Sequence, residues 1–244
     1  MYESNHERRA VERWRPGQRW YHPALAALVI GTSRFIMTRM NHLEIEGLDR
    51  FDALMDRAGR GLLTFSNHVS LFDDPILLSN FGLPGYPNLR WVAADAINFF
   101  GSAPKAWLFT AGKAVPIVRG AGLDQPGFGF LRERLHEGAW VHFFPEGGRT
   151  RDPRYLLRPR LRNGMGHLMA ETRPIALPFY HYGMHRVLPI GAKAPRRDNT
   201  VRVVFGEPLD CAGDATADAL TARSYKALRA LEQRLHPNAQ GDTA

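Results

Sequence analysis

The chain has 244 residues, of which 44% are hydrophobic and 23% charged, a composition that excludes an intrinsically disordered protein. Its formal net charge of +8, with all but four of the 32 basic residues being arginine, indicates an anionic partner or surface, and the guanidinium group is well suited to phosphate. The single cysteine, Cys211, excludes an intramolecular disulfide and a cysteine-based metal site, and we expect it to be a packing residue.

Residues 1–42 combine basic, aromatic and apolar stretches. Arginine alternates with Trp14 and Trp20 up to residue 22, and an uncharged run follows from Pro23 to Ser33. A helix of that length spans about 16 Å, too short to cross a hydrocarbon core about 30 Å thick. Arginines and aromatic residues before a short apolar helix predict a segment that lies in one leaflet of a membrane. The alternative is a helix packed on the protein's own core.

Apolar runs of strand length alternate with helix-like stretches from residue 43 onward. We expect strands at residues 43–48, 61–66, 89–94, 114–119, 140–144, 174–182 and 200–206. We expect helices near residues 75–81, 98–111, 127–137, 160–171 and 216–235. Runs that are apolar at every position, such as 140–144, are typical of strands covered on both faces. The alternation predicts a single layered α/β domain over residues 43–236, with a mostly parallel central sheet flanked by helices, followed by a mobile tail at 237–244.

The stretch NHVSLFDDP, at residues 67–75, lies where the second predicted strand gives way to a helix. Asp74 followed by Pro75 predicts the helix start, with Asp74 as the N-cap. His68 and Asp73 are therefore expected in the strand-to-helix turn, which can bring the carboxylate onto one imidazole nitrogen and raise the basicity of the other. The pair is a candidate general base, and the alternative is a local structural hydrogen bond.

Two further strand ends carry charged residues. The stretch FPEGGR places Glu146 and Arg149 directly after the strand at 140–144, and Gly147 allows the backbone to approach a ligand closely. Arg119 ends the strand that begins at residue 114. Because the carboxyl ends of parallel strands meet at one edge of a sheet, we expect these residues beside His68, where they would bind a polar, phosphorylated substrate.

These motifs resemble those of the glycerolipid acyltransferase superfamily, which includes the lysophosphatidic acid acyltransferases. Histidine and aspartate five residues apart, with FPEG further along the chain, are typical of the superfamily, and the doubled aspartate before proline is closer to its tafazzin branch of phospholipid–lysophospholipid transacylases. The stretches that are similar to that branch also include AADAINF, GKAVPIVRG, GAWVHFFPEG and IALPFYHYGMHRVLP. The resemblance covers residues 60–210 in consistent order.

The resemblance implies acyl transfer to a lysophospholipid hydroxyl, with His68 as the general base and Asp73 orienting it, in phospholipid and cardiolipin remodelling. It implies substrate-binding roles for Asn67, Arg119, Glu146, Gly147 and Arg149. It also implies phospholipid and lysophospholipid substrates, no cofactor, no nucleic acid, and a peripheral or monotopic protein on an anionic membrane surface, at the cytoplasmic face of a bacterial inner membrane.

Several alternatives remain at this stage. The GGRT stretch after Glu146 is nearer to the lysophosphatidic acid acyltransferases, which implies acyl-coenzyme A as the donor. A serine-dependent lipid hydrolase is disfavoured because the chain has no G-x-S-x-G motif. A third alternative is a non-enzymatic protein that binds anionic membrane. We expect no metal, since the four-residue spacing of His181 and His185 suits a metal site on a helix and not the strand end predicted there.

Overall fold

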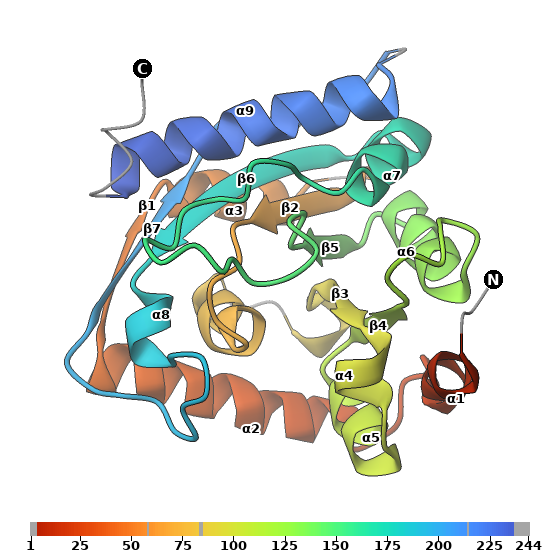
Figure 1. The fold of residues 1–244 in the computed structure, drawn as a ribbon, viewed down its shortest axis with the longest axis horizontal. Helices are drawn as coiled ribbons and strands as arrows, with labels where there is room; N and C mark the ends of the chain where they lie inside the picture. Colours follow the sequence, from red (N-terminus) through yellow and green to blue (C-terminus); the bar gives the residue numbers. More distant parts are fainter. Residues whose placement is uncertain (1–3, 58, 83–84, 214, 237–244) are drawn as a thin grey trace.

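The computed structural model describes residues 4–57, 59–82, 85–213 and 215–236, so the tail expected at 237–244 lies outside the described residues. The strands are β1 (His42–Glu46), β2 (Leu62–Ser66), β3 (Trp91–Asp95), β4 (Ala114–Ile117), β5 (Trp140–Phe143), β6 (Ile175–Tyr182), β7 (Thr200–Phe205) and β8 (Leu209–Asp210). They form one sheet in the order β1-β7-β6-β2-β5-β3-β4, and β8 pairs with β6 (Figure 1). Only the pairings of β6 with β7 and β8 are antiparallel, which confirms the mostly parallel sheet.

Helices cover both faces of this sheet. The α-helices are α1 (Asn5–Arg13), α2 (His22–Phe35), α3 (Leu48–Met55), α4 (Ala96–Phe100), α5 (Ala103–Ala111), α6 (Pro126–His136), α7 (Gly164–Thr172), α8 (Met184–Val187) and α9 (Ala217–Leu235). Short π and 3-10 turns are η1 (Ile36–Met40), η2 (Asp73–Leu77), η3 (Leu78–Asn80) and η4 (Tyr86–Asn88). Helices α7 and α9 pack together beside β6, and α2 runs on the opposite side of the molecule (Figure 1).

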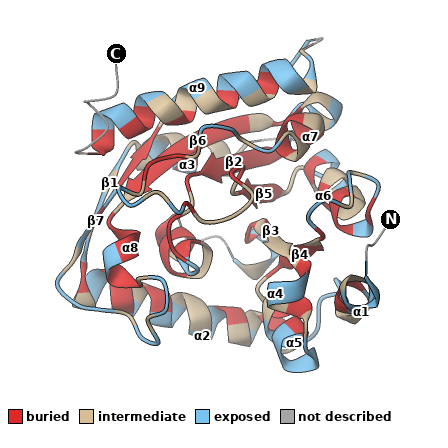
Figure 2. Cartoon of the chain, viewed as in Figure 1, coloured by how far each residue is buried: buried red, intermediate tan, exposed pale blue. Residues whose placement is uncertain are grey.

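Burial on both faces explains why the central strands are apolar at every position. In β2, Leu63 and Phe65 join a core cluster that includes residues of α6, α7 and α9, whereas Leu62 joins a second cluster with Phe51 of α3 and residues of η2. Successive side chains of a strand point to opposite faces, so both faces must be apolar when both are covered. Figure 2 shows β2, β5 and β6 as almost wholly buried.

The helical segment that follows the His68 turn begins at a different residue from the one predicted. Asp74 is not an N-cap: the helical segment η2 begins at Asp73, two residues before the predicted start at Pro75, and Phe72 occupies the cap position without a side-chain cap. The carboxylate of Asp74 instead pairs with Arg90, whose Nε donates to Oδ1 at 2.7 Å. The prediction was wrong because a bidentate ion pair with an arginine from a distant loop competes with local capping, and the sequence around Pro75 does not reveal that partner.

The N-terminal segment packs on the domain and also presents apolar side chains outward. Helix α1 begins with a capping box between Ser4 and Glu7, and Val11 and Trp14 are buried in the main core. Helix α2 follows, but Trp20 is 91% exposed and Leu28 66% exposed. Within the part of the chain that is described, no helix combines the length and apolar character needed to span a bilayer.

Candidate active site

The turn after β2 brings His68 and Asp73 together. Nδ1 of His68 lies 2.9 Å from Oδ2 of Asp73, and the same oxygen accepts hydrogen bonds from the backbone N–H groups of Val69 and Ser70 at 2.8 and 2.9 Å. Asp73 is fully buried. The backbone of the turn therefore fixes the carboxylate, and the carboxylate in turn fixes the imidazole ring, as the sequence led us to expect.

The electrostatics of the turn favour an ionised Asp73, which orients the imidazole of His68. Burial opposes ionisation of Asp73, but His181 and the hydrogen bonds from His68 and Ser70 hold its pKa below the ordinary value. An ionised carboxylate accepts the hydrogen on Nδ1 of His68, which leaves Nε2 as the nitrogen that can accept a proton. The imidazole ring of His68 stacks on Phe144 with centroids 4.1 Å apart, and the His68 side chain is 15% exposed. His68 is thus held rigidly but is open to a substrate.

Glu146 is placed differently from the expectation that it binds substrate. Its residue is 1% exposed, and its two carboxylate oxygens accept hydrogen bonds from the backbone N–H groups of His68, at 2.8 Å, and Arg158, at 2.9 Å. Burial raises the pKa of Glu146 to about 7 despite these hydrogen bonds. Its carboxylate therefore braces the turn that carries His68 against the loop that follows β5.

Asn67 also differs from its expected place on the substrate side. Its side-chain amide donates to the carbonyl of His181 at 2.9 Å and accepts from the N–H of the same residue at 3.0 Å, and the residue is 1% exposed. Asn67 therefore joins the end of β2 to the end of β6. Burial lowers the pKa of His181, although Asp73 opposes the shift. Nε2 of the neutral ring lies 3.1 Å from the Asn67 carbonyl and 3.7 Å from the Asp73 carboxylate.

Arg119, Arg158 and the paired glycines form a cationic cradle beside the turn, which we call the arginine cradle. A Cβ on Gly148 would lie 3.7 Å from both terminal nitrogens of Arg119 and from Nη2 of Arg158, so the two guanidinium groups flank the glycine. Gly147 has φ +69°, and a side chain there would lie 2.9 Å from Cγ of Arg162. Glycine is favoured at position 147 by the left-handed backbone and by the lack of space for a side chain. Its N–H donates to the carbonyl of Phe144 at 3.0 Å, so the groups that the cradle offers to an anion are the guanidinium groups.

The partners of the two arginines differ. Arg119 pairs with Asp95 at the end of β3, with 3.0 Å between Nε and Oδ2, and its side chain remains 58% exposed. Arg158 donates to the backbone carbonyl of Arg149 at 2.6 Å. Arg149 itself is half-buried. The structure thus brings Arg119, Gly147 and Arg149 to the side of the sheet that carries His68, as expected.

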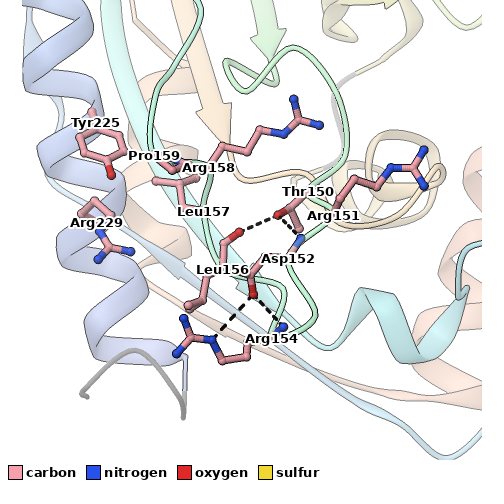
Figure 3. Close-up of a pocket in the computed structure, with 10 residues that line it drawn as sticks. All are labelled: Thr150, Arg151, Asp152, Arg154, Leu156, Leu157, Arg158, Pro159, Tyr225 and Arg229. Carbon is pink, nitrogen blue, oxygen red and sulfur yellow. Dashed lines mark hydrogen bonds and ion pairs between the residues drawn. The ribbon is translucent and has the colours of Figure 1, made fainter. Parts of the chain in front are cut away.

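A cleft of about 550 Å³ lies next to this cradle, between the loop at 150–159 and α9 (Figure 3). Arginine side chains dominate its lining, together with Tyr225 on α9. The backbone N–H of Thr150 donates to the carbonyl of His68 at 2.8 Å, so the loop that forms the cleft is attached to the His68 turn. Among the described residues, no three histidine, cysteine, aspartate or glutamate side chains gather in a way that could hold a metal ion.

The sequence matches a family model described as Acyltransferase over residues 42–182. The chain belongs to the acyltransferase family. The matched segment contains both the His68–Asp73 turn and the Glu146 brace, so the geometry described above lies within the region that defines the family. The protein is therefore an enzyme that transfers acyl groups, which excludes the non-enzymatic alternative.

Two related proteins and one solved structure extend this result. N-acylphosphatidylethanolamine synthase from Arabidopsis thaliana is 32% identical over 199 residues, 75% of this chain and 69% of that protein. Tafazzin from Drosophila melanogaster is 31% identical over 207 residues, 80% of this chain but 53% of its own, so the chain spans about half of that relative. The crystal structure of the 1-acyl-sn-glycerophosphate (LPA) acyltransferase PlsC from Thermotoga maritima superposes with a TM-score of 0.65 at 17% identity, covering 87% of this chain and 79% of that one. That likeness confirms the acyltransferase fold.

Three residues of this acyltransferase site were not anticipated from the sequence. Arg158 and Asp95 lie far along the chain from His68, and His181 was considered only as a metal ligand. The weak signals that could have found them are positional: Asp95 and His181 lie at strand ends on the same edge of the sheet as His68.

Proposed function

We propose that this acyltransferase moves a fatty acyl chain from a phospholipid to the free hydroxyl group of a lysophospholipid, with His68 as the general base. The observation that supports the proposal best is the 2.9 Å contact between Nδ1 of His68 and the buried carboxylate of Asp73. It leaves Nε2 as the proton acceptor, on a side chain that is partly exposed. General bases of this kind need a fixed tautomer and access to the substrate.

The reaction proceeds by direct transfer. Nε2 of His68 removes the hydroxyl proton as the lysophospholipid oxygen attacks the acyl carbonyl carbon of the donor. The tetrahedral intermediate collapses, the bond to the donor's oxygen breaks, and the imidazolium returns its proton to that departing alkoxide. One ester and one alcohol are consumed and one of each is formed, so no cofactor, metal or covalent acyl-enzyme is needed. Asp73 stabilises the imidazolium while it exists.

Of the residues expected to bind substrate, some are proposed to touch the lipid and others to position the backbone around His68. Arg119, Gly147 and Arg149 are proposed to contact the phosphate or glycerol of the acceptor lipid, since the arginine cradle offers guanidinium donors to an anion and glycine allows the lipid to approach the backbone closely. Asn67 and Glu146 are proposed to act indirectly, because each is buried and bonds to the backbone that carries His68 or adjoins it.

We also propose that the enzyme works on an anionic membrane surface, as a peripheral or monotopic protein at the cytoplasmic face of a bacterial inner membrane. Exposed apolar side chains occur on α2, at Leu28 and Phe35, and on the segments beside it. Trp20 precedes α2, while Phe72 and Trp107 belong to the turn before η2 and to α5, two elements that α2 packs against. Phe72 directly precedes Asp73, so this apolar surface adjoins the reaction turn. Apolar and aromatic side chains at this spacing suit insertion between headgroups, and residues 1–42 are proposed to supply the main anchor.

The acyl donor and acceptor are tested together. Purified enzyme is incubated with a lysophospholipid and a phospholipid carrying a labelled acyl chain, with and without unlabelled acyl-coenzyme A. The proposal expects labelled phospholipid from the lysophospholipid without the thioester. Strict dependence on acyl-coenzyme A would instead indicate a 1-acylglycerol-3-phosphate acyltransferase, the activity named for the structural neighbour. Label on the amine of phosphatidylethanolamine would indicate the activity named for the plant relative.

A further inference from the structure

The phenyl ring of Phe144 covers one face of the proposed general base. The rings of His68 and Phe144 are stacked, with centroids 4.1 Å apart and an angle of 21° between their planes. The Asp73 carboxylate contacts the same imidazole from a different direction, at Nδ1. Because the lone pair of Nε2 lies in the plane of the imidazole, a ring stacked on the face leaves that nitrogen free to accept a proton. Phe144 therefore contacts His68 without blocking the proposed reaction.

Phe144 is itself held in place by its neighbours. It directly follows β5, and its carbonyl accepts from the N–H of Gly147 at 3.0 Å. The rings of His142 and Phe144 meet edge to face, with centroids 4.5 Å apart. His142 is fully buried, and its Nδ1 lies 2.9 Å from Oγ1 of Thr64. The phenyl ring thus contacts one fixed histidine in the interior and the proposed base at the surface.

The two histidines beside Phe144 differ in the charge that they can carry. Burial lowers the pKa of His142 well below its ordinary value, so that ring stays neutral. The His68 side chain is partly exposed and is the one that takes a proton in the proposed reaction. The face of a phenyl ring carries partial negative charge, and it attracts a cation that lies within about 6 Å of the ring centroid. The spacing of His68 and Phe144 satisfies this condition.

We propose that Phe144 is a positioning residue that stabilises the imidazolium of His68 through the face of its ring. This inference rests on the proposed function, in which Nε2 of His68 takes the proton of the acceptor hydroxyl. The positive charge that develops on the imidazole then has two favourable contacts, the Asp73 carboxylate and the phenyl face. A neutral imidazole gains less from that face than an imidazolium does. The contact therefore favours the transition state over the ground state and acts on kcat rather than on KM.

Replacing Phe144 by mono-, di- and trifluorophenylalanine tests the inference with little change in the size of the ring. Each fluorine withdraws negative charge from the ring face, which weakens its attraction for a cation. The same series at Phe143 is the control, because that ring belongs to the main core and lies beside Phe128, with centroids 6.3 Å apart. Initial rates of acyl transfer are measured for each variant over a range of acceptor and donor concentrations, and unfolding is followed in denaturant.

We expect kcat to fall with each fluorine at position 144, by about tenfold from phenylalanine to trifluorophenylalanine, which is within the range of a partly desolvated cation–π contact. The KM for both lipids and the free energy of unfolding should stay constant, and the series at position 143 should leave kcat unchanged. Equal kcat values across the series at position 144 would overturn the inference. An equal fall at both positions would also overturn it, because it would reflect a general effect of fluorine on the fold.

Phe144→Leu gives a second measurement, since leucine is apolar but has no aromatic face. We expect its kcat to fall by about 3- to 30-fold at unchanged KM. A rise in KM with kcat unchanged would overturn the inference, because it would show that Phe144 contacts a lipid instead. The activity of His68→Ala separates this inference from the proposed function. If His68→Ala is inactive and the fluorine series has no effect, the general base stands and the role of Phe144 fails, whereas an active His68→Ala contradicts the proposed function itself.

Discussion

The backbone N–H of His68 donates a hydrogen bond of 2.8 Å to the carboxylate of Glu146. These residues are 78 positions apart and belong to different strand-to-loop junctions, after β2 and after β5, which are parallel neighbours in the sheet. The bond joins the two sequence motifs of the site into one structural unit. The position of the proposed general base therefore depends on a residue that is itself buried.

Replacing Glu146 with glutamine should weaken this brace. A glutamine carbonyl can accept from only one of the two backbone N–H groups, and its NH₂ group would face the other donor. We expect kcat to fall by about 10- to 100-fold and the free energy of unfolding to fall by about 1–3 kcal/mol, the cost of a buried unsatisfied donor. Denaturant unfolding and acyl-transfer rates measure the two effects. Glu137→Gln, at an exposed position on the surface, is the control, and matching behaviour of the two variants would contradict the brace.

Asp73→Asn tests the orientation of the imidazole. An asparagine oxygen can still accept from Val69 and Ser70, so the turn should keep its shape, but a neutral amide cannot stabilise an imidazolium. We expect kcat to fall by about 10²- to 10⁴-fold, the range for general-base catalysis, with little change in KM. Asp124→Asn, on an exposed loop, should retain full activity. Turnover close to that of the parent enzyme in Asp73→Asn would remove the dyad from the mechanism.

Asn67→Ala tests the clamp between β2 and β6. The change deletes both side-chain hydrogen bonds to the backbone of His181 and leaves a buried N–H and a buried carbonyl without their partners. We expect the free energy of unfolding to fall by about 2–6 kcal/mol, since each of the two unsatisfied buried groups costs about 1–3 kcal/mol. In the protein that remains folded, the KM for both lipids should stay within about twofold of the parent value, because Asn67 is proposed to make no contact with either lipid. A rise in KM without loss of stability would restore the original expectation that Asn67 binds substrate.

The pH dependence of stability follows from buried histidines. Burial lowers the pKa of His142 and of His181, and it lowers the pKa of His185 to about 4. As the pH falls below about 6.5, the unfolded chain binds protons on these residues and the folded chain does not, so unfolding becomes more favourable. Glu146 acts in the opposite sense: its pKa of about 7 in the folded state stabilises the fold at low pH, and that contribution is lost as the pH rises toward 7.

Burial also lowers the pKa of His22 and His236, so the destabilising effect of acid on the buried histidines exceeds the stabilising effect of Glu146. We expect the free energy of unfolding to be lower at pH 5.0 than at pH 7.5 by roughly 2–4 kcal/mol, as measured by denaturant titration. Glu146→Gln removes the opposing contribution, so its loss of stability over the same interval should be larger. Stability that remains constant or increases on acidification would show that these histidines accept protons in the folded protein.

Much of the fold was predictable because it depends on local patterns. Apolar runs of strand length located seven of the strands, and α9 began and ended within a residue of its expected range. The long helix expected at 98–111 is broken between Phe100 and Ala103, so that α4 and α5 form in its place. The two-residue strand β8 and the short helix α3 were not predicted. Neither is long enough to give a clear periodic signal.

The site was predictable to the extent that it depends on strand ends. His68, Arg119 and Gly147 were expected at one edge of the sheet because the carboxyl ends of parallel strands share an edge. The buried contacts of Asn67 and Glu146 were not predicted, for a common reason. Asn67 bonds to the backbone of His181, 114 positions away, and Glu146 bonds to the backbone of His68, 78 positions away, so only the folded chain reveals these partners.

Association with membranes should depend on the apolar surface of α2. Leu28→Glu combined with Phe35→Glu introduces two charges at exposed positions of α2, and we expect binding to anionic vesicles to weaken at least about tenfold through loss of apolar insertion and charge repulsion. Ala222→Glu combined with Ala230→Glu, at exposed positions of α9, on the opposite side of the molecule in Figure 1, is the matched control. Vesicle co-sedimentation measures the binding of both double variants. Equal binding of the two would contradict the proposal that the α2 surface contacts the membrane.

The central claim, that the imidazole of His68 deprotonates the acceptor hydroxyl, is tested most directly by the initial rate of acyl transfer from labelled phospholipid to lysophospholipid in His68→Ala. The variant should remain folded and bound to vesicles, and its rate should fall by at least about 10³-fold, which is more than a loss of binding affinity at one contact produces. A rate within tenfold of the parent enzyme, measured on protein with unchanged unfolding and vesicle binding, would contradict the account.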